Sequence, residues 1–163
     1  MAKIVLSAIL GALVWATVGA GLAVGDSDPQ ATASDPTDVL GVWAFQTKPY
    51  RDGTCVMTGR MHLSSNSEDG IYDCELTALE KCSVWGQSLV RQSCTARRFG
   101  NQVSVRSNVE EVLERKSEIE GMIFNYVPDN FALTVQSSQR MYGALVSAVT
   151  APVEFRRSDE GVS

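Results

Sequence analysis

Apolar and polar side chains alternate with a period of two in one segment after another from residue 41 onward. This period places every second side chain on the same face, as in a β-strand with one face in a core and the other in solvent. We expect strands at residues 43–45, 55–63, 72–78, 84–96, 103–107, 122–126, 131–135, 141–149 and 153–157. The side chains expected to face inward are Trp43, Phe45, Met57, Met61, Leu63, Tyr72, Leu76, Phe124, Tyr126, Phe131, Leu133 and Met141. The pattern predicts an all-β protein.

Turn-forming residues separate these segments at positions 51–53, 64–70, 99–101, 128–130 and 151–152. Short turns between successive strands favour consecutive antiparallel pairing, and about eight such strands can close into a barrel without exposed edges. We therefore expect a single antiparallel up-and-down β-barrel of about eight strands over residues 40–157. A two-sheet β-sandwich is the structural alternative.

Residues 107–117 carry two conflicting patterns. Ser107 and Glu110 have the spacing of a helix capping box, and apolar residues follow at helical intervals at Val109, Val112 and Leu113. We expect a strand that ends near Ser107, followed by a short helix or a charged loop over residues 108–117.

The N-terminus has the layout of a secretory signal peptide. Lys3 is followed by 22 uncharged residues, 4–25, which end in small side chains. An uncleaved N-terminal membrane anchor is the alternative, because a stretch of this length can span a bilayer. We expect residues 1–25 to be a cleaved signal, residues 26–39 an acidic disordered linker and residues 158–163 a tail. The protein is then periplasmic or extracellular.

Four cysteines, Cys55, Cys74, Cys82 and Cys94, lie within 40 residues of each other. In an exported chain an even number of cysteines predicts disulfides, whereas a metal site needs closely spaced ligand pairs that are missing here. Three pairings are possible. A hairpin centred near residue 84 favours Cys74–Cys94 and leaves Cys55–Cys82, although the spacing does not decide among the three.

Charge and motifs argue against several classes of function. Residues 41–157 contain 13 Lys and Arg and 13 Asp and Glu, a balance that disfavours nucleic-acid binding. His62 is the one histidine, and its alternation places it on the polar face of a strand. The acidic groups, Asp73 with Glu75 and Glu110 with Glu111 and Glu114, fit solvated faces better than a hydrolase site. We expect a non-catalytic protein without metal or cofactor.

The first strand begins with Gly41-Val42-Trp43, and the last ends with Arg156-Arg157. These features resemble the calycin superfamily of barrels, which includes lipocalins, avidins and a bacterial metalloprotease inhibitor. The resemblance implies that Arg156 or Arg157 packs across Trp43 and closes one end of the barrel. It further implies binding of a small ligand in the barrel mouth, or protease inhibition by an N-terminal segment such as residues 26–38.

We therefore expect an exported binding protein that captures a small apolar or amphipathic ligand inside a β-barrel. The candidate ligand-binding residues are Met57, Met61, Tyr72, Phe124 and Tyr142. The alternative is a protein-interaction module, such as a periplasmic protease inhibitor, or a structural envelope protein. An interaction module would have a filled barrel and a loop or tail that faces its partner. The sequence does not determine the oligomeric state or the identity of the ligand.

Overall fold

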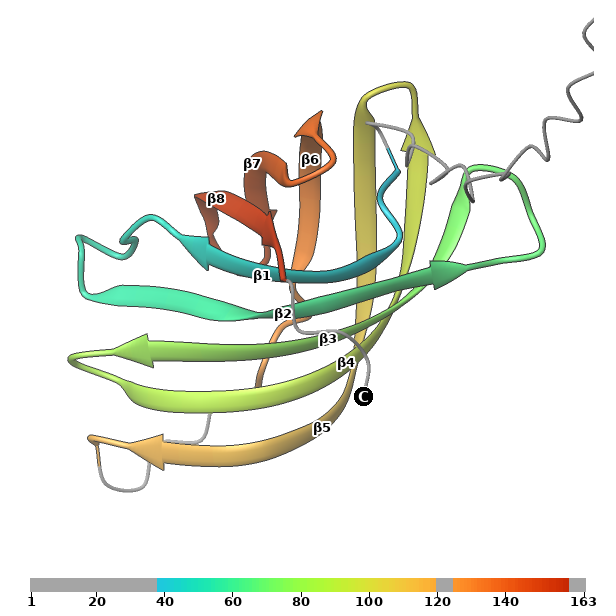
Figure 1. Cartoon of the computed structure of the whole chain (residues 1–163). Coiled ribbons are helices and arrows are strands. Elements are labelled where there is room, and N and C mark those ends of the chain that lie inside the picture. Colours follow the sequence, from blue (N-terminus) through green and yellow to red (C-terminus); the bar gives the residue numbers. More distant parts are fainter. Residues whose placement is uncertain (1–37, 120–124, 159–163) are drawn as a thin grey trace, which may run out of the picture. The chain divides into compact units, whose positions relative to one another are not determined.

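The computed structural model describes residues 38–119 and 125–158 and contains eight β-strands (Figure 1). The strands are β1 (Gly41–Thr47), β2 (Cys55–Ser65), β3 (Ile71–Cys82), β4 (Gly86–Phe99), β5 (Gln102–Ser117), β6 (Asn130–Ser137), β7 (Arg140–Val146) and β8 (Thr150–Arg157). Each strand pairs antiparallel with the next, and β8 pairs with β1, so the sheet closes into a barrel. The up-and-down barrel predicted from the alternation is confirmed, and the sandwich alternative is wrong.

The barrel interior is built by the alternation itself. On β2, Met57, Met61 and Leu63 are buried, while Arg60 between them points outward. Gly59 interrupts the apolar face for a steric reason: a Cβ at this position would lie 2.6 Å from the ring of Phe45. A glycine on β2 therefore makes room for an aromatic side chain from β1.

Aromatic side chains fill the middle of the barrel. Phe45 stacks on Phe155 with ring centroids 4.9 Å apart, and Phe131 meets both rings edge-on at 5.3 and 5.2 Å. These three residues come from β1, β8 and β6, so the contacts tie together strands that are distant in sequence. This part of the interior is a packed core.

The disulfides join neighbouring strands at positions that face each other. Cys55 and Cys82 are register partners on β2 and β3, and Cys74 and Cys94 are register partners on β3 and β4. This is the pairing that the hairpin symmetry favours, because β3 and β4 are joined by a turn at residues 83–85.

The expected helix or loop at residues 108–117 is wrong. These residues continue β5 and pair with β4 as far as Ser117. Two register shifts in this pairing, next to Val90 and Gln92 of β4, each insert an extra residue on β5. Such bulges interrupt strict alternation, so the apolar residues Val109, Val112 and Leu113 acquire a spacing that imitates a helix.

Two other expectations near the C-terminal half need correction. Tyr126 belongs to the connection between β5 and β6 and not to a strand of its own, whereas Met122 and Phe124 lie outside the described residues. The expected break at Ala151 and Pro152 falls inside β8, and the turn lies at residues 147–149. Pro152 fits the strand because its carbonyl accepts a hydrogen bond from the Lys48 amide, just beyond the end of β1. The register between β1 and β8 ends at Thr47 and Val153, so the missing N–H of Pro152 lies just beyond that ladder.

The expected signal peptide at residues 1–25, most of the linker at 26–39 and most of the tail at 158–163 lie outside the described residues. Within the described residues, no helix has the length and apolar character to cross a membrane.

Candidate functional site

The end of the barrel at which β1 begins is closed by Trp43 and Arg157. The Trp43 indole is fully buried, and its Nε1 donates to the Val39 carbonyl at 2.8 Å. The Arg157 guanidinium lies 4.6 Å from the centre of the indole ring. It also donates to the carbonyls of Leu40 and, at 2.6 Å, of Asp38. A cation over an aromatic face, with its N–H groups satisfied by carbonyls, fixes the segment before β1 across this end.

Arg156, the other arginine considered for this role, lies on the outer surface. Its side chain is 72% exposed and forms an ion pair with Glu154 on the same strand. The alternation of β8 separates the two arginines, because neighbouring residues on a strand point to opposite faces.

The opposite end of the barrel contains a cavity of about 160 Å³. Its walls come from the β1–β2 loop, the β3–β4 turn, the connection before β6 and the β7–β8 turn. The apolar part of the lining includes Met57, Trp85, Leu145 and Val149. The polar part includes Tyr50, Glu80, Tyr126 and Asp129.

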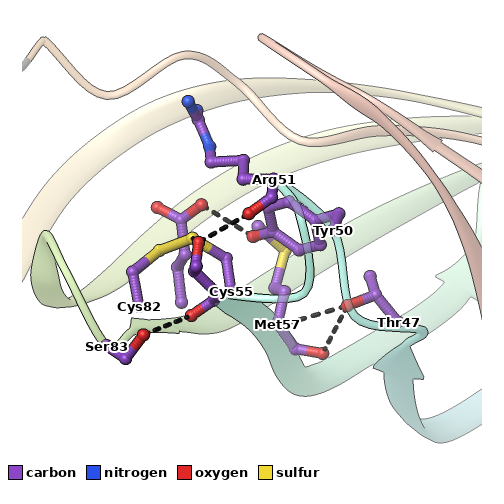
Figure 2. Close-up of a disulfide and its surroundings, with 9 residues drawn as sticks. Thr47, Tyr50, Arg51, Cys55, Met57, Cys82 and Ser83 are labelled. Atoms are coloured by element: carbon purple, nitrogen blue, oxygen red, sulfur yellow. Dashed lines mark hydrogen bonds between the residues drawn. A yellow bond between two sulfur atoms is a disulfide. The ribbon is translucent and has the colours of Figure 1, made fainter.

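One wall is held by Tyr50 and the Cys55–Cys82 disulfide (Figure 2). Tyr50 and Cys55 exchange two backbone hydrogen bonds, which fold the β1–β2 loop back onto β2. The Tyr50 hydroxyl donates to Glu80 Oε1 at 2.6 Å. Burial raises the pKa of Tyr50, and the hydrogen bond to the Glu80 carboxylate raises it further. The phenol therefore keeps its proton and serves as a donor to Glu80.

The other wall is organised by Asp129, which is 1% exposed. Its Oδ2 accepts from Tyr126 Oη at 2.6 Å and from Gln92 Nε2 at 2.7 Å, and its amide donates to Gln92 Oε1 at 3.0 Å. Ser107 Oγ donates to the Asp129 carbonyl at 2.6 Å. Asp129 Oδ1 has no hydrogen bond among the described residues. The Ser147 hydroxyl lies near this carboxyl group and lowers its pKa, but it donates to the Val127 carbonyl at 3.2 Å. Gln92 of β4 and Tyr126 thus hold Oδ2 of the carboxyl group, Ser107 of β5 holds the backbone of the same residue, and Oδ1 is left without a hydrogen bond.

The surroundings of Asp129 disfavour its charged form. Burial raises the pKa of this carboxyl to about 6, and the nearby Glu80 acts in the same direction, although the hydrogen bonds from Tyr126 and Gln92 oppose the shift. Burial and the charge of Asp129 also raise the pKa of Tyr126. At neutral pH the site therefore holds a carboxylate that water does not solvate.

The five expected ligand-binding residues do not gather at one site. Met57 lines the cavity, but Met61 is fully buried and does not line it. Tyr72 is the second residue of β3, at the opposite end of the barrel, and Tyr142 is 49% exposed on the outer face of β7. Phe124 lies outside the described residues.

The polar half of the site was missed because Asp129 looks like a turn residue in the sequence. Gln92 offered a signal that could have found it. Along β4 it alternates with exposed residues in step with Val90, Cys94 and Ala96, so its side chain points into the barrel as theirs do. A polar side chain at a core position needs a buried partner, and here that partner is Asp129.

The two tyrosine–carboxylate pairs of the lining offer hydrogen-bond acceptors. Both tyrosine hydroxyls donate to carboxylates, which leaves the phenol oxygens and the carboxylates as acceptors. Cys55, Glu80 and Cys82 have potential metal-ligand atoms within 4.8 Å of one another. The two sulfurs are bonded to each other, so this group supplies one carboxylate and does not fit a metal centre.

No protein-family model and no curated protein matches the chain. Among solved structures, the chain is similar to a de novo designed fluorescence-activating β-barrel, with 16% sequence identity and a TM-score of 0.44. The match covers 73% of this chain and 93% of the designed one.

Proposed function

We propose that this protein is a non-catalytic binding protein that takes up a small amphipathic molecule in the cavity at its barrel mouth. The cavity of about 160 Å³ is the observation that carries the proposal. A protein cavity of roughly 150 Å³ holds a benzene molecule, so this one matches a ligand of about one ring. Apolar walls with a few convergent polar groups are the usual composition of a small-molecule site.

The packing of the rest of the barrel supports entry from the mouth. The Phe45, Phe131 and Phe155 rings fill the middle, and Trp43 with Arg157 closes the far end. A ligand would therefore rest on the packed core and leave by the route it entered. The contact between Arg157 and Trp43 is also the one that the calycin resemblance implies, and we propose that the barrel is of this type.

We further propose that the protein is exported and acts in the periplasm or outside the cell. Disulfides persist in oxidising compartments, and both pairs of cysteines are bonded here. Residues 1–25 would be removed as a signal peptide.

Native mass spectrometry of the protein purified from its own host tests these proposals. The denatured mass is expected to lack residues 1–25, and the native mass to exceed it by a constant increment from a small molecule. A denatured mass that retains residues 1–25 would contradict cleavage of the signal.

A variant pair tests whether the increment comes from the cavity. Val149→Trp should abolish it, because Val149 lines the cavity and a larger ring there would occupy the space. Val146→Trp, at a 40% exposed position on the same hairpin, should retain it. Equal increments in both variants would contradict binding at the mouth.

A further inference from the structure

We propose that the ligand carries a protonated amino group, and that this group pairs with Asp129 at the inner end of the cavity. The inference rests on the proposed binding function and specifies the chemical class of the ligand: a compact ring or short apolar body bearing an ammonium group.

The unused accepting capacity of Asp129 is the first observation. Asp129 is on the cavity wall and is 1% exposed, and its Oδ1 has no hydrogen bond among the described residues, because the nearby Ser147 hydroxyl donates to the Val127 carbonyl. A buried acceptor without a partner is costly, and more so when it is charged. An ammonium group has three N–H donors and a full positive charge, so it can both donate to this acceptor and neutralise the carboxylate.

The second observation is that the donors around Asp129 are already used on Oδ2. Tyr126 Oη and Gln92 Nε2 both donate to that oxygen. Across the cavity, the Tyr50 hydroxyl is likewise committed to Glu80. The inner wall therefore offers acceptors to a ligand and lacks free donors among these four groups.

The third observation is the arrangement of charge. Two carboxylates, Glu80 and Asp129, line the cavity, and Glu80 disfavours ionisation of Asp129. The cations of the lining, Arg51 and Arg115, belong to exposed residues at the rim. Their charges are screened by water more than those of buried groups. The cationic group of a ligand would thus pair with the negative charge of Asp129 and Glu80, away from the arginines at the rim.

Benzylamine and benzyl alcohol are a matched pair of probes for this inference. Each has one ring and one polar group, and they differ in the charge at neutral pH. Titration followed by amide NMR at pH 7.5 should show benzylamine binding at least about tenfold more tightly, because hydrogen bonds to charged groups are stronger than neutral ones.

Asp129→Asn should remove this preference, so that the two probes bind with affinities within about threefold of each other. An Asn carbonyl can still accept from Tyr126 and Gln92, so the variant removes the charge while retaining the observed contacts. Asp73→Asn is the matched control. It removes the same charge from an exposed position on the outer face of β3 and should preserve the preference.

A second measurement does not depend on any variant. Magnetisation transfer from the benzylamine methylene protons to the Tyr126 ring protons should be observed in the wild-type protein, because Tyr126 contacts Asp129. Its absence in a bound complex would place the amine elsewhere and overturn the inference.

The outcomes separate the inference from the function on which it rests. Equal or weaker binding of benzylamine than of benzyl alcohol overturns the amine inference and leaves the binding function intact. Tighter binding of benzoate would assign the ligand's charge to the arginines instead. Asp129-dependent shifts with calcium chloride alone would indicate an inorganic cation and also overturn the inference. Binding of none of these probes would contradict the proposed function itself.

Discussion

Asp129→Asn should change how the stability of the ligand-free protein depends on pH. The pKa of this carboxyl rises from an ordinary value of 3.8 to about 6 on folding. Between these two values the folded state binds more protons than the unfolded state, so stability falls as the pH rises. The difference is about 2 pKa units, which corresponds to about 3 kcal/mol at 1.36 kcal/mol per unit.

This contribution favours folding fully below about pH 4 and is lost as the pH rises through about 6. The variant lacks the carboxyl group, so its stability relative to wild type should increase by about 2.4 kcal/mol between pH 4 and pH 7.5, since part of the effect lies below pH 4. Urea unfolding of both proteins at half-unit pH steps measures this difference, and the contributions of unchanged groups cancel in it.

A difference that stays flat across this range would refute the reasoning. It would mean that Asp129 is solvated or paired in the folded protein, and the amine inference would lose its first observation. A difference that falls with pH would show that the carboxylate is stabilised by its neighbours in the folded protein.

Two further predictions concern the barrel itself. Replacing Cys74 and Cys94 together by Ala should lower the free energy of unfolding by about 3 kcal/mol, because the disulfide closes a loop with a sequence separation of 20. Urea unfolding without reductant measures this loss, and an unchanged unfolding midpoint would contradict the prediction. Arg157→Leu should cost about 3 kcal/mol or more, since it removes the contact with Trp43 and the hydrogen bonds to Leu40 and Asp38. Arg156→Leu, which loses only an exposed ion pair, should change stability by less than about 1 kcal/mol, and equal losses in the two variants would disprove the assigned role of Arg157.

Most of the fold could be predicted because the signal for a strand is local. Trp43 and Phe45, like Met61 and Leu63, are two residues apart and point to the same face, and this spacing is visible within a few residues of sequence. A closed barrel then follows from many short strands joined by short turns. The favoured cysteine pairing likewise followed from the position of one turn. On β5 the strand was not predicted to its full length, because two bulges interrupt the alternation of inward and outward side chains.

The candidate site could not be predicted in the same way. Asp129 is an ordinary turn residue until the barrel closes and brings it to Gln92, 37 residues earlier in the chain. Met57 and Met61 have the same parity on β2, yet only Met57 reaches the cavity, because depth along the barrel axis is not encoded in alternation.

On most strands the sequence by itself determined which side chains face inward, because this depends on neighbours within a few positions. The exceptions are β5, with its two bulges, and the expected turn at 151–152, which falls inside β8. The resemblance to calycins implied a cationic partner for Trp43 on the last strand, and the alternation of β8 was needed to select Arg157 over Arg156. Only the tertiary structure decided where the core stops and a cavity begins, and that a buried carboxyl group lines it. Both depend on volumes and contacts between strands that are distant in the sequence, which no local pattern records.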